Sequence, residues 1–201
     1  MPSHTASRAL LHHTLGQSTL STPIKAAVVG LAVAVTAASA QFTLPLPFTV
    51  VPFTLTPMAV ILTGAALGSR LGALSQALYV LAGAFGLAVF APSATLPPGF
   101  LRLMGPTGGY LLAYPLAAFV TGYLAERGWD RRYVTSALAM LAGLSVIYVG
   151  GMAWLAAAYT GSLAAAFTAG VAQFVLLDVL KVGAAAMILP STWRLVGRDQ
   201  R

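Results

Sequence analysis

The chain of 201 residues has no cysteine and very little charge. Charged residues make up 7% of it and hydrophobic residues 58%, whereas soluble domains carry about 25% charged residues. Without cysteine there is no disulfide framework and no cysteine-based metal or redox site. Because a soluble domain with so few charges would lack a polar surface, the composition predicts an integral membrane protein whose solvent is the lipid bilayer.

The chain also lacks the residues that several other functional classes require. The three histidines, His4, His12 and His13, all lie in the polar N-terminal tail, far from any carboxylate cluster, so we expect no metal site. The chain has no phosphate-binding loop with a Gly-Lys-Ser/Thr end, and nothing in it suggests a cofactor. Its net charge of +7 is spread over short loops and tails, which does not indicate nucleic-acid binding. The apolar segments are continuous rather than alternating, which argues against a β-barrel.

Six hydrophobic segments predict an all-α bundle of six transmembrane helices. A helix that crosses a bilayer needs about 20 apolar residues, and the segments lie at residues 24–42, 54–68, 72–91, 107–125, 133–158 and 164–190. The second segment is short, and Pro45, Pro47 and Pro52 before it predict a loop or a broken helix at the membrane edge. The chain would then consist of a polar tail (1–23), one transmembrane domain (24–190) and a basic C-terminal tail (191–201).

The basic residues predict the orientation of this bundle. With six spans, one side of the membrane collects Arg8, Lys25, Arg70, Arg127, Arg131, Arg132, Arg194, Arg198 and Arg201. The opposite side has only Arg102, and Lys181 lies within a span. Since cytoplasmic loops carry the excess of Lys and Arg, we expect both termini in the cytoplasm. The loops at 43–53, 92–106 and 159–163 would then face outward from a multi-pass protein of the cell membrane.

A signal peptide is a competing interpretation of the N-terminus. Lys25, an apolar run and Ala38-Ser39-Ala40 imitate a signal peptide with its A-x-A cleavage site. The long polar leader before Lys25 argues against it. Cleavage would also remove a span and upset the charge pattern.

Asp178 and Lys181 lie inside a long hydrophobic segment, Phe174 to Leu189, where no other residue is charged. A charge near the bilayer centre costs about 2.5–3.5 kcal/mol on insertion scales, so such residues usually face the protein interior and are functional. Positions i and i+3 share a helix face. The pair therefore predicts a polar recognition site or a proton relay, and a buried ion pair that only fixes helix packing is the remaining alternative.

Two further motifs stand out. Residues 105–110 read Gly-Pro-Thr-Gly-Gly-Tyr at the start of the fourth span. Adjacent glycines permit close approach of the backbone to a ligand or a helix, and Tyr110 adds an aromatic face with a polar tip. In the first span, Ala26, Gly30, Ala34 and Ala38 recur every four residues. Small residues at this spacing let helices approach closely in lipid, either inside the bundle or against another membrane protein.

These motifs resemble the BioY family, the biotin-binding S components of energy-coupling factor (ECF) vitamin transporters. The run from Gly105 to Leu111 matches the most specific motif of the family. Asp178-x-x-Lys181, followed by an alanine-rich run, matches its last span, and Trp154-Leu155 sits where a Trp-Leu is usual. The resemblance covers roughly residues 24–190. This chain departs from the family at Thr54-Leu55-Thr56-Pro57, where Thr-Leu-Gln-Thr is common, and at Ala88, where proline is common.

The resemblance implies a six-helix subunit, not an enzyme, that captures biotin with high affinity on the outer side. As partners it also implies two ATPase subunits and a transmembrane coupling protein, and the coupling protein would dock against Ala26, Gly30, Ala34 and Ala38. Biotin carries ureido N–H donors, an apolar body and a carboxylate, and an acid and an ammonium can bind its polar groups. The candidate substrate-binding residues are Asp178, Lys181, Thr107, Gly108, Gly109 and Tyr110.

A stand-alone proton-coupled secondary transporter of a small carboxylate-bearing solute is the main alternative, with Asp178 as the proton carrier. Lys181 beside it should favour the charged carboxylate and oppose that role. The absence of an evident internal repeat also fits poorly with inverted-repeat transporters. An intramembrane enzyme is disfavoured because no histidine lies in a span and no Ser/Lys or paired-carboxylate constellation is evident.

Overall fold

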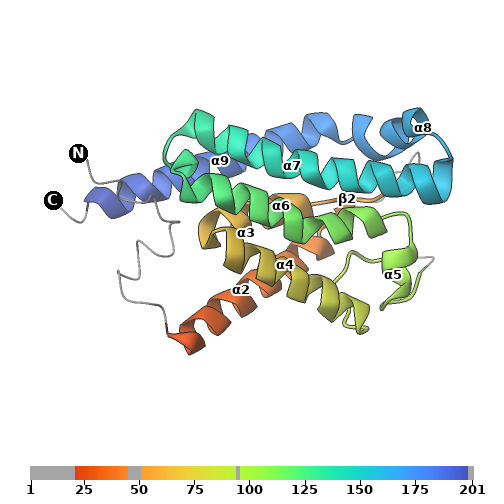
Figure 1. Cartoon of the computed structure of the whole chain (residues 1–201), viewed down its shortest axis with the longest axis horizontal. Coiled ribbons are helices and arrows are strands. Elements are labelled where there is room, and N and C mark those ends of the chain that lie inside the picture. The colour runs from red at the N-terminus through yellow and green to blue at the C-terminus, as the bar shows by residue number, and fades with distance from the viewer. Residues whose placement is uncertain (1–20, 45–50, 94–95, 199–201) are drawn as a thin grey trace.

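The computed structural model of the chain is described here for residues 21–44, 51–93 and 96–198, and it is almost entirely helical (Figure 1). Its α-helices are α2 (Thr22–Gln41), α3 (Thr56–Leu67), α4 (Ser69–Ala84), α5 (Leu101–Met104), α6 (Gly108–Glu126), α7 (Tyr133–Leu155), α8 (Leu163–Phe167) and α9 (Val175–Arg198). A 3₁₀ turn η1 (Trp129–Arg131) and two π-helical turns, η2 (Ala156–Thr160) and η3 (Thr168–Ala172), complete the helical segments.

Four of the described helical segments are long and apolar enough to cross a membrane. They are Thr22–Gln41, Gly108–Glu126, Tyr133–Thr160 and Val175–Thr192. Helices α3 and α4 have 12 and 16 residues, which at about 1.5 Å per residue is shorter than a hydrocarbon core of about 30 Å. The helical class is confirmed, whereas the six-helix count and the cytoplasmic termini stay predictions.

Several predicted boundaries need correction. The third segment does not continue to residue 91, because α4 ends at Ala84 and Gly86 follows with φ 96°. The sixth segment is not one regular helix, since a turn at 173–174 separates η3 from α9. Helix α9 also continues through Pro190 to Arg198, so the described part of the predicted C-terminal tail is helical. The predicted loop at 43–53 contributes to a short antiparallel pair, β1 (Thr43–Leu44) with β2 (Phe53–Thr54).

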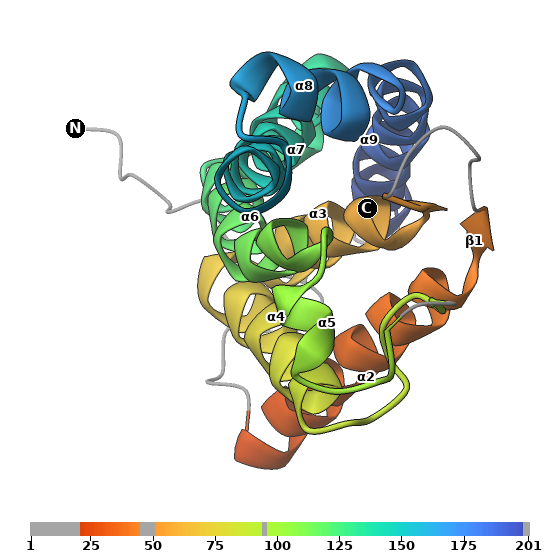
Figure 2. The same ribbon diagram turned by 90° about the vertical axis from the view of Figure 1, so that its right-hand side faces the viewer.

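The helices form two groups, and α6 packs against members of both. Seen end-on, α2, α3 and α4 lie on one side and α7, α8 and α9 on the other, while α5 covers the near end (Figure 2). Helix α6 packs against α7, α3 and α4. Its buried residues include glycines and alanines at 109, 113, 117, 118, 122 and 125, which let three neighbours approach it closely.

Close backbone contacts along α6 require small residues. A Cβ atom added to Gly64 of α3 would lie 2.5 Å from the carbonyl oxygen of Ala118. A Cβ atom on Gly122 would meet the backbone of Gly68 and Ser69 at 2.5 Å. Gly68 itself has φ 86° and joins α3 directly to α4. Glycine at these positions therefore sets how tightly the first group of helices packs onto α6.

The two ends of the bundle differ in charge. The α6–α7 connection with Arg127, Arg131 and Arg132 lies at the same end as the C-terminal end of α9, and α5 with Arg102 lies at the opposite end (Figure 1). At the basic end, the Glu126 carboxylate accepts hydrogen bonds from the Ser69 backbone N–H at 2.7 Å and from its hydroxyl at 3.0 Å. This contact fixes the start of α4 against the end of α6.

We expect Gly64→Ala to lower the thermal stability of the detergent-purified protein, because the added Cβ has only backbone atoms of Ala118 to push against. Overpacking of this kind costs about 1–3 kcal/mol. Gly30→Ala in α2 is the matched control. Nothing lies within 4 Å of a Cβ at that position, and alanine is the better helix former. Thermal unfolding followed by circular dichroism measures both, and equal melting temperatures for the two variants would contradict the packing argument.

Candidate ligand-binding site

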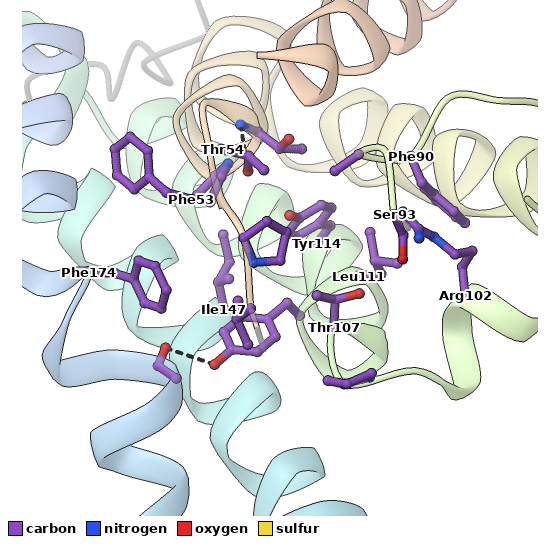
Figure 3. Close-up of a pocket in the computed structure, with 18 of the residues that line it drawn as sticks. Phe53, Thr54, Phe90, Ser93, Arg102, Thr107, Leu111, Tyr114, Ile147 and Phe174 are labelled. Carbon is purple, nitrogen blue, oxygen red and sulfur yellow. Dashed lines mark hydrogen bonds between the residues drawn. The ribbon is translucent and has the colours of Figure 1, made fainter. Parts of the chain in front are cut away.

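A cavity of about 480 Å³ lies between the two groups of helices. Its volume falls within the range of about 300–1,000 Å³ that small-molecule sites occupy. The wall is formed by Val51, Pro52, Phe53, Thr54, Thr56, Pro57, Tyr79, Phe90, Ala91, Pro92, Ser93, Leu96, Arg102, Pro106, Thr107, Tyr110, Leu111, Tyr114, Ile147, Tyr148, Gly170, Phe174 and Asp178. Figure 3 shows side chains from β2, α6, α7 and the loop before α5 converging on this space.

The wall is mainly aromatic and aliphatic. The ring of Tyr79 meets Phe90 edge-on, with centroids 5.5 Å apart, and stacks on Tyr114 at 6.3 Å. The Tyr79 hydroxyl donates to the Val89 carbonyl at 3.2 Å, and the Tyr110 hydroxyl donates to the Gly170 carbonyl at 2.8 Å. These bonds hold the rings in place, so the cavity presents a fixed apolar surface with few polar groups.

Asp178 lies in the cavity wall and is 5% exposed. Its Oδ1 accepts a hydrogen bond from the Lys181 ammonium at 2.7 Å, and its Oδ2 accepts one from the Tyr148 hydroxyl at 2.5 Å. A buried carboxylate needs such partners because burial removes its water. The predicted i, i+3 contact between Asp178 and Lys181 is present in the structure, and α7 adds a third member.

Lys181 stands behind Asp178 rather than in the cavity wall. Its ammonium also donates to the Thr54 carbonyl at 2.6 Å and lies 3.5 Å from the centroid of the Phe53 ring. Both partners belong to β2, so the lysine joins α9 to the strand that precedes α3. The cation–π contact and the carbonyl bond compensate for the desolvation of the ammonium.

The glycine motif divides into two parts. Thr107 and Tyr110 line the cavity. Gly108 and Gly109 do not appear in its wall: a Cβ on Gly108 would lie 1.9 Å from the Leu103 carbonyl oxygen, and one on Gly109 would lie 2.2 Å from Cβ of Trp154. Both glycines allow close packing, under α5 and against α7, and their contact with a ligand stays a prediction.

Arg102 is a residue of the site that the sequence analysis did not predict. It comes from α5, is 8% exposed and lines the cavity. One of its guanidinium nitrogens donates to the Leu96 carbonyl at 3.4 Å. Burial lowers the pKa of this guanidinium from its usual value. Arg102 and Phe174, one turn before Asp178, lie on opposite sides of the cavity (Figure 3). Arg102 is the only basic residue for which the sequence predicts an outward-facing position, and that was the signal that could have indicated a function.

The sequence also gave no indication of Tyr148, or of the contribution of α7 to the site. Nothing in the spacing of residues relates Tyr148 to Asp178, which lies 30 residues later, and only the packing of α7 on α9 brings them together. Thr56 and Pro57, the two positions at which this segment departs from the pattern given above, both line the cavity.

The small residues of the first span lie on an open face. Ala26, Gly30, Ala34 and Ala38 are all exposed on α2, whereas Val29, Ala32, Thr36 and Ala40 are buried against the bundle. Internal packing therefore uses the other face of α2.

Among the described residues no group of three His, Cys, Asp or Glu side chains could hold a metal ion, and the three histidines lie outside those residues.

Comparison with known proteins gives a consistent result. The BioY family matches residues 13–198 of this chain. The probable biotin transporter BioY of Pyrococcus horikoshii is 41% identical over 161 residues, which are 80% of this chain and 91% of that protein. The biotin transporter BioY of Thermotoga maritima is 40% identical over 147 residues, or 71% of this chain and 81% of that protein.

The fold also has a counterpart among solved structures. It matches the crystal structure of the S component for biotin from an ECF-type ABC transporter with a TM-score of 0.74. The match covers 88% of this chain and 95% of that one at 20% sequence identity. This similarity shows that the two chains share a fold.

Proposed function

The chain belongs to the BioY family, and we propose that it is the biotin-binding S component of an ECF-type importer. The relatives are named as transporters, not enzymes, and the proposed activity is capture of biotin for transport. The observation that carries the proposal is the cavity itself, in which a buried carboxylate and a buried guanidinium flank an aromatic wall.

The polar groups of the cavity match the two ends of biotin. The ureido ring of biotin has two N–H donors, and the Asp178 carboxylate is an acceptor for them. The biotin carboxylate would be repelled by Asp178, so we place it at Arg102, whose planar guanidinium can bind a carboxylate through two parallel bonds. The thioether ring and the aliphatic chain would then lie along Tyr79, Tyr114 and Phe174, in the apolar middle of the cavity.

The alternative of a proton-coupled transporter is less well supported by the contacts. A proton carrier must gain and lose a proton during each cycle, but both oxygens of Asp178 accept bonds from donors that stabilise its charged form.

The orientation that we propose follows the charge distribution. The end with Arg127, Arg131 and Arg132 faces the cytoplasm, both termini lie there, and Arg102 with the cavity lies toward the outside.

We expect Asp178→Asn and Lys181→Ala to weaken biotin binding strongly. Losing one partner of a buried charged pair typically costs about 2–5 kcal/mol, which corresponds to about thirtyfold or more in affinity. Isothermal titration of the purified proteins with biotin measures the change, with thermal unfolding as the check on folding. Folded variants that bind biotin as tightly as the parent would show that the pair is structural.

The placement of the biotin carboxylate is tested in the same titrations. Arg102→Gln should weaken binding of biotin but not of biotin methyl ester, which has no charge to pair with the guanidinium. Equal losses for the two ligands would place the carboxylate elsewhere in the cavity.

The exposed face of α2 is the proposed docking surface for the coupling protein. Ala34→Trp should abolish transport and co-purification of the complex but leave biotin binding nearly intact, because lipid tolerates bulk where a closely packed helix does not. Ala32→Trp is the matched control, since Ala32 is buried on the opposite face of the same helix and its replacement should destabilise the isolated subunit. If Ala34→Trp itself unfolds the subunit, the four-residue spacing serves internal packing.

We expect this chain alone in liposomes to bind biotin without accumulating it. The chain has no phosphate-binding loop, and its intramembrane acid is held by two donors. Concentrative uptake should require a coupling protein and ATPases, with ATP on the side of the basic loops. Uptake of labelled biotin is measured with and without an inward proton gradient. Gradient-driven accumulation by this chain alone would instead identify Asp178 as a proton carrier.

A further inference from the structure

We infer that Tyr148 is a positioning residue for the ligand, because its hydroxyl orients the Asp178 carboxylate in the cavity wall. The inference rests on the proposed function, in which that carboxylate accepts the ureido N–H groups of biotin. Tyr148 lies near the middle of α7 and also lines the cavity. Its hydroxyl donates to Asp178 Oδ2 at 2.5 Å, a short bond of the kind that forms between a hydroxyl and an ionised oxygen.

Each oxygen of the carboxylate has one donor, and the two donors come from different helices. Lys181 is on the same helix as Asp178, and its ammonium divides its hydrogen bonds between Oδ1 and the Thr54 carbonyl. Tyr148 comes from α7, on a planar ring that also lines the cavity. The terminal torsion of an aspartate is soft, so a donor to each oxygen is needed to fix the plane of the carboxylate. Tyr148 is the donor to Oδ2 and ties that plane to a second helix.

Two donors leave room for the ligand. An ionised carboxylate offers about four acceptor positions on its two oxygens, of which Tyr148 and Lys181 occupy two. The remaining positions can accept N–H groups from the cavity side. Because folding has already ordered the acceptor, the ligand does not have to restrict it on binding, and the affinity is correspondingly higher.

The chain contains a matched control for this tyrosine. Tyr133, the first residue of α7, also directs its hydroxyl to a side chain of α9, with 3.5 Å between its oxygen and Oγ of Ser191. It is exposed and does not belong to the cavity wall. Tyr133→Phe and Tyr148→Phe therefore each remove a hydroxyl at the same pair of helices, but only Tyr148→Phe affects the Asp178 carboxylate.

Titration of the full-length purified protein with biotin tests the inference. We expect Tyr148→Phe to weaken biotin binding about tenfold, because the variant loses a hydrogen bond to a charged group. Tyr133→Phe should leave biotin binding unchanged. In a double-mutant cycle, Tyr148→Phe should add no further loss to Asp178→Asn, because the hydroxyl acts through the carboxylate. Replacing Tyr148 by 4-aminophenylalanine, which keeps the ring and a donor at its para position, should recover most of the affinity.

A second ligand distinguishes a positioning role of Tyr148 from a general disruption of the binding site. For biotin methylated on both ureido nitrogens, which has no N–H group for Asp178, Tyr148→Phe should cause no comparable loss. The inference is overturned if Tyr148→Phe binds biotin like the parent. It is also overturned if the variant weakens both ligands equally, if its effect adds to that of Asp178→Asn, or if the amino analogue fails to recover binding. A parent protein that does not bind biotin at all would instead overturn the proposed function, and this inference with it.

Discussion

The constraint on which the site depends is a carboxylate that must stay charged where it has little water to bind. Asp178 is 5% exposed in the most hydrophobic part of α9, and an isolated charge in such surroundings is costly. The structure meets that cost with Lys181 from the same helix and Tyr148 from α7, and Lys181 is itself bonded to β2. One charged group thereby holds together α7, α9 and the strand that enters α3.

The cavity lies where the close packing of helices against α6 ends. Gly64 and Gly122 allow backbone contact between α3, α4 and α6, which leaves no space there for a ligand. Farther toward α5, aromatic side chains replace the small residues, and Tyr79, Tyr110 and Tyr114 form a wall instead of a packed interface. Small residues therefore mark where the bundle is closed. Tyrosines line the part that stays open, and the hydroxyls of Tyr79 and Tyr110 are held there by backbone carbonyls.

The binding site and the proposed docking face occupy different parts of the molecule. The wall includes residues of α3, α4, α6, α7 and α9 but none of α2, whereas the exposed small residues lie on α2. We expect a subunit built in this way to bind its proposed ligand without its proposed partners. It also lacks, in its sequence, a phosphate-binding loop with which to use ATP. This separation is why binding and transport are expected to respond to different substitutions.

The sequence by itself determined the features that depend on local pattern. Continuous apolar segments predicted the helices to within a few residues in α2, α6 and α7, and the i, i+3 spacing predicted the contact of Asp178 with Lys181. Four-residue spacing marked the small residues of α2, but only burial distinguished an open face from an internal one. Tertiary structure alone decided the rest: Tyr148 reaches Asp178 from another helix, Arg102 joins the cavity wall from α5, and Gly108 and Gly109 pack closely against Leu103 and Trp154. A sequence pattern carries the period of one helix, whereas a cavity is formed by side chains from several helices, and their relative positions are set by packing.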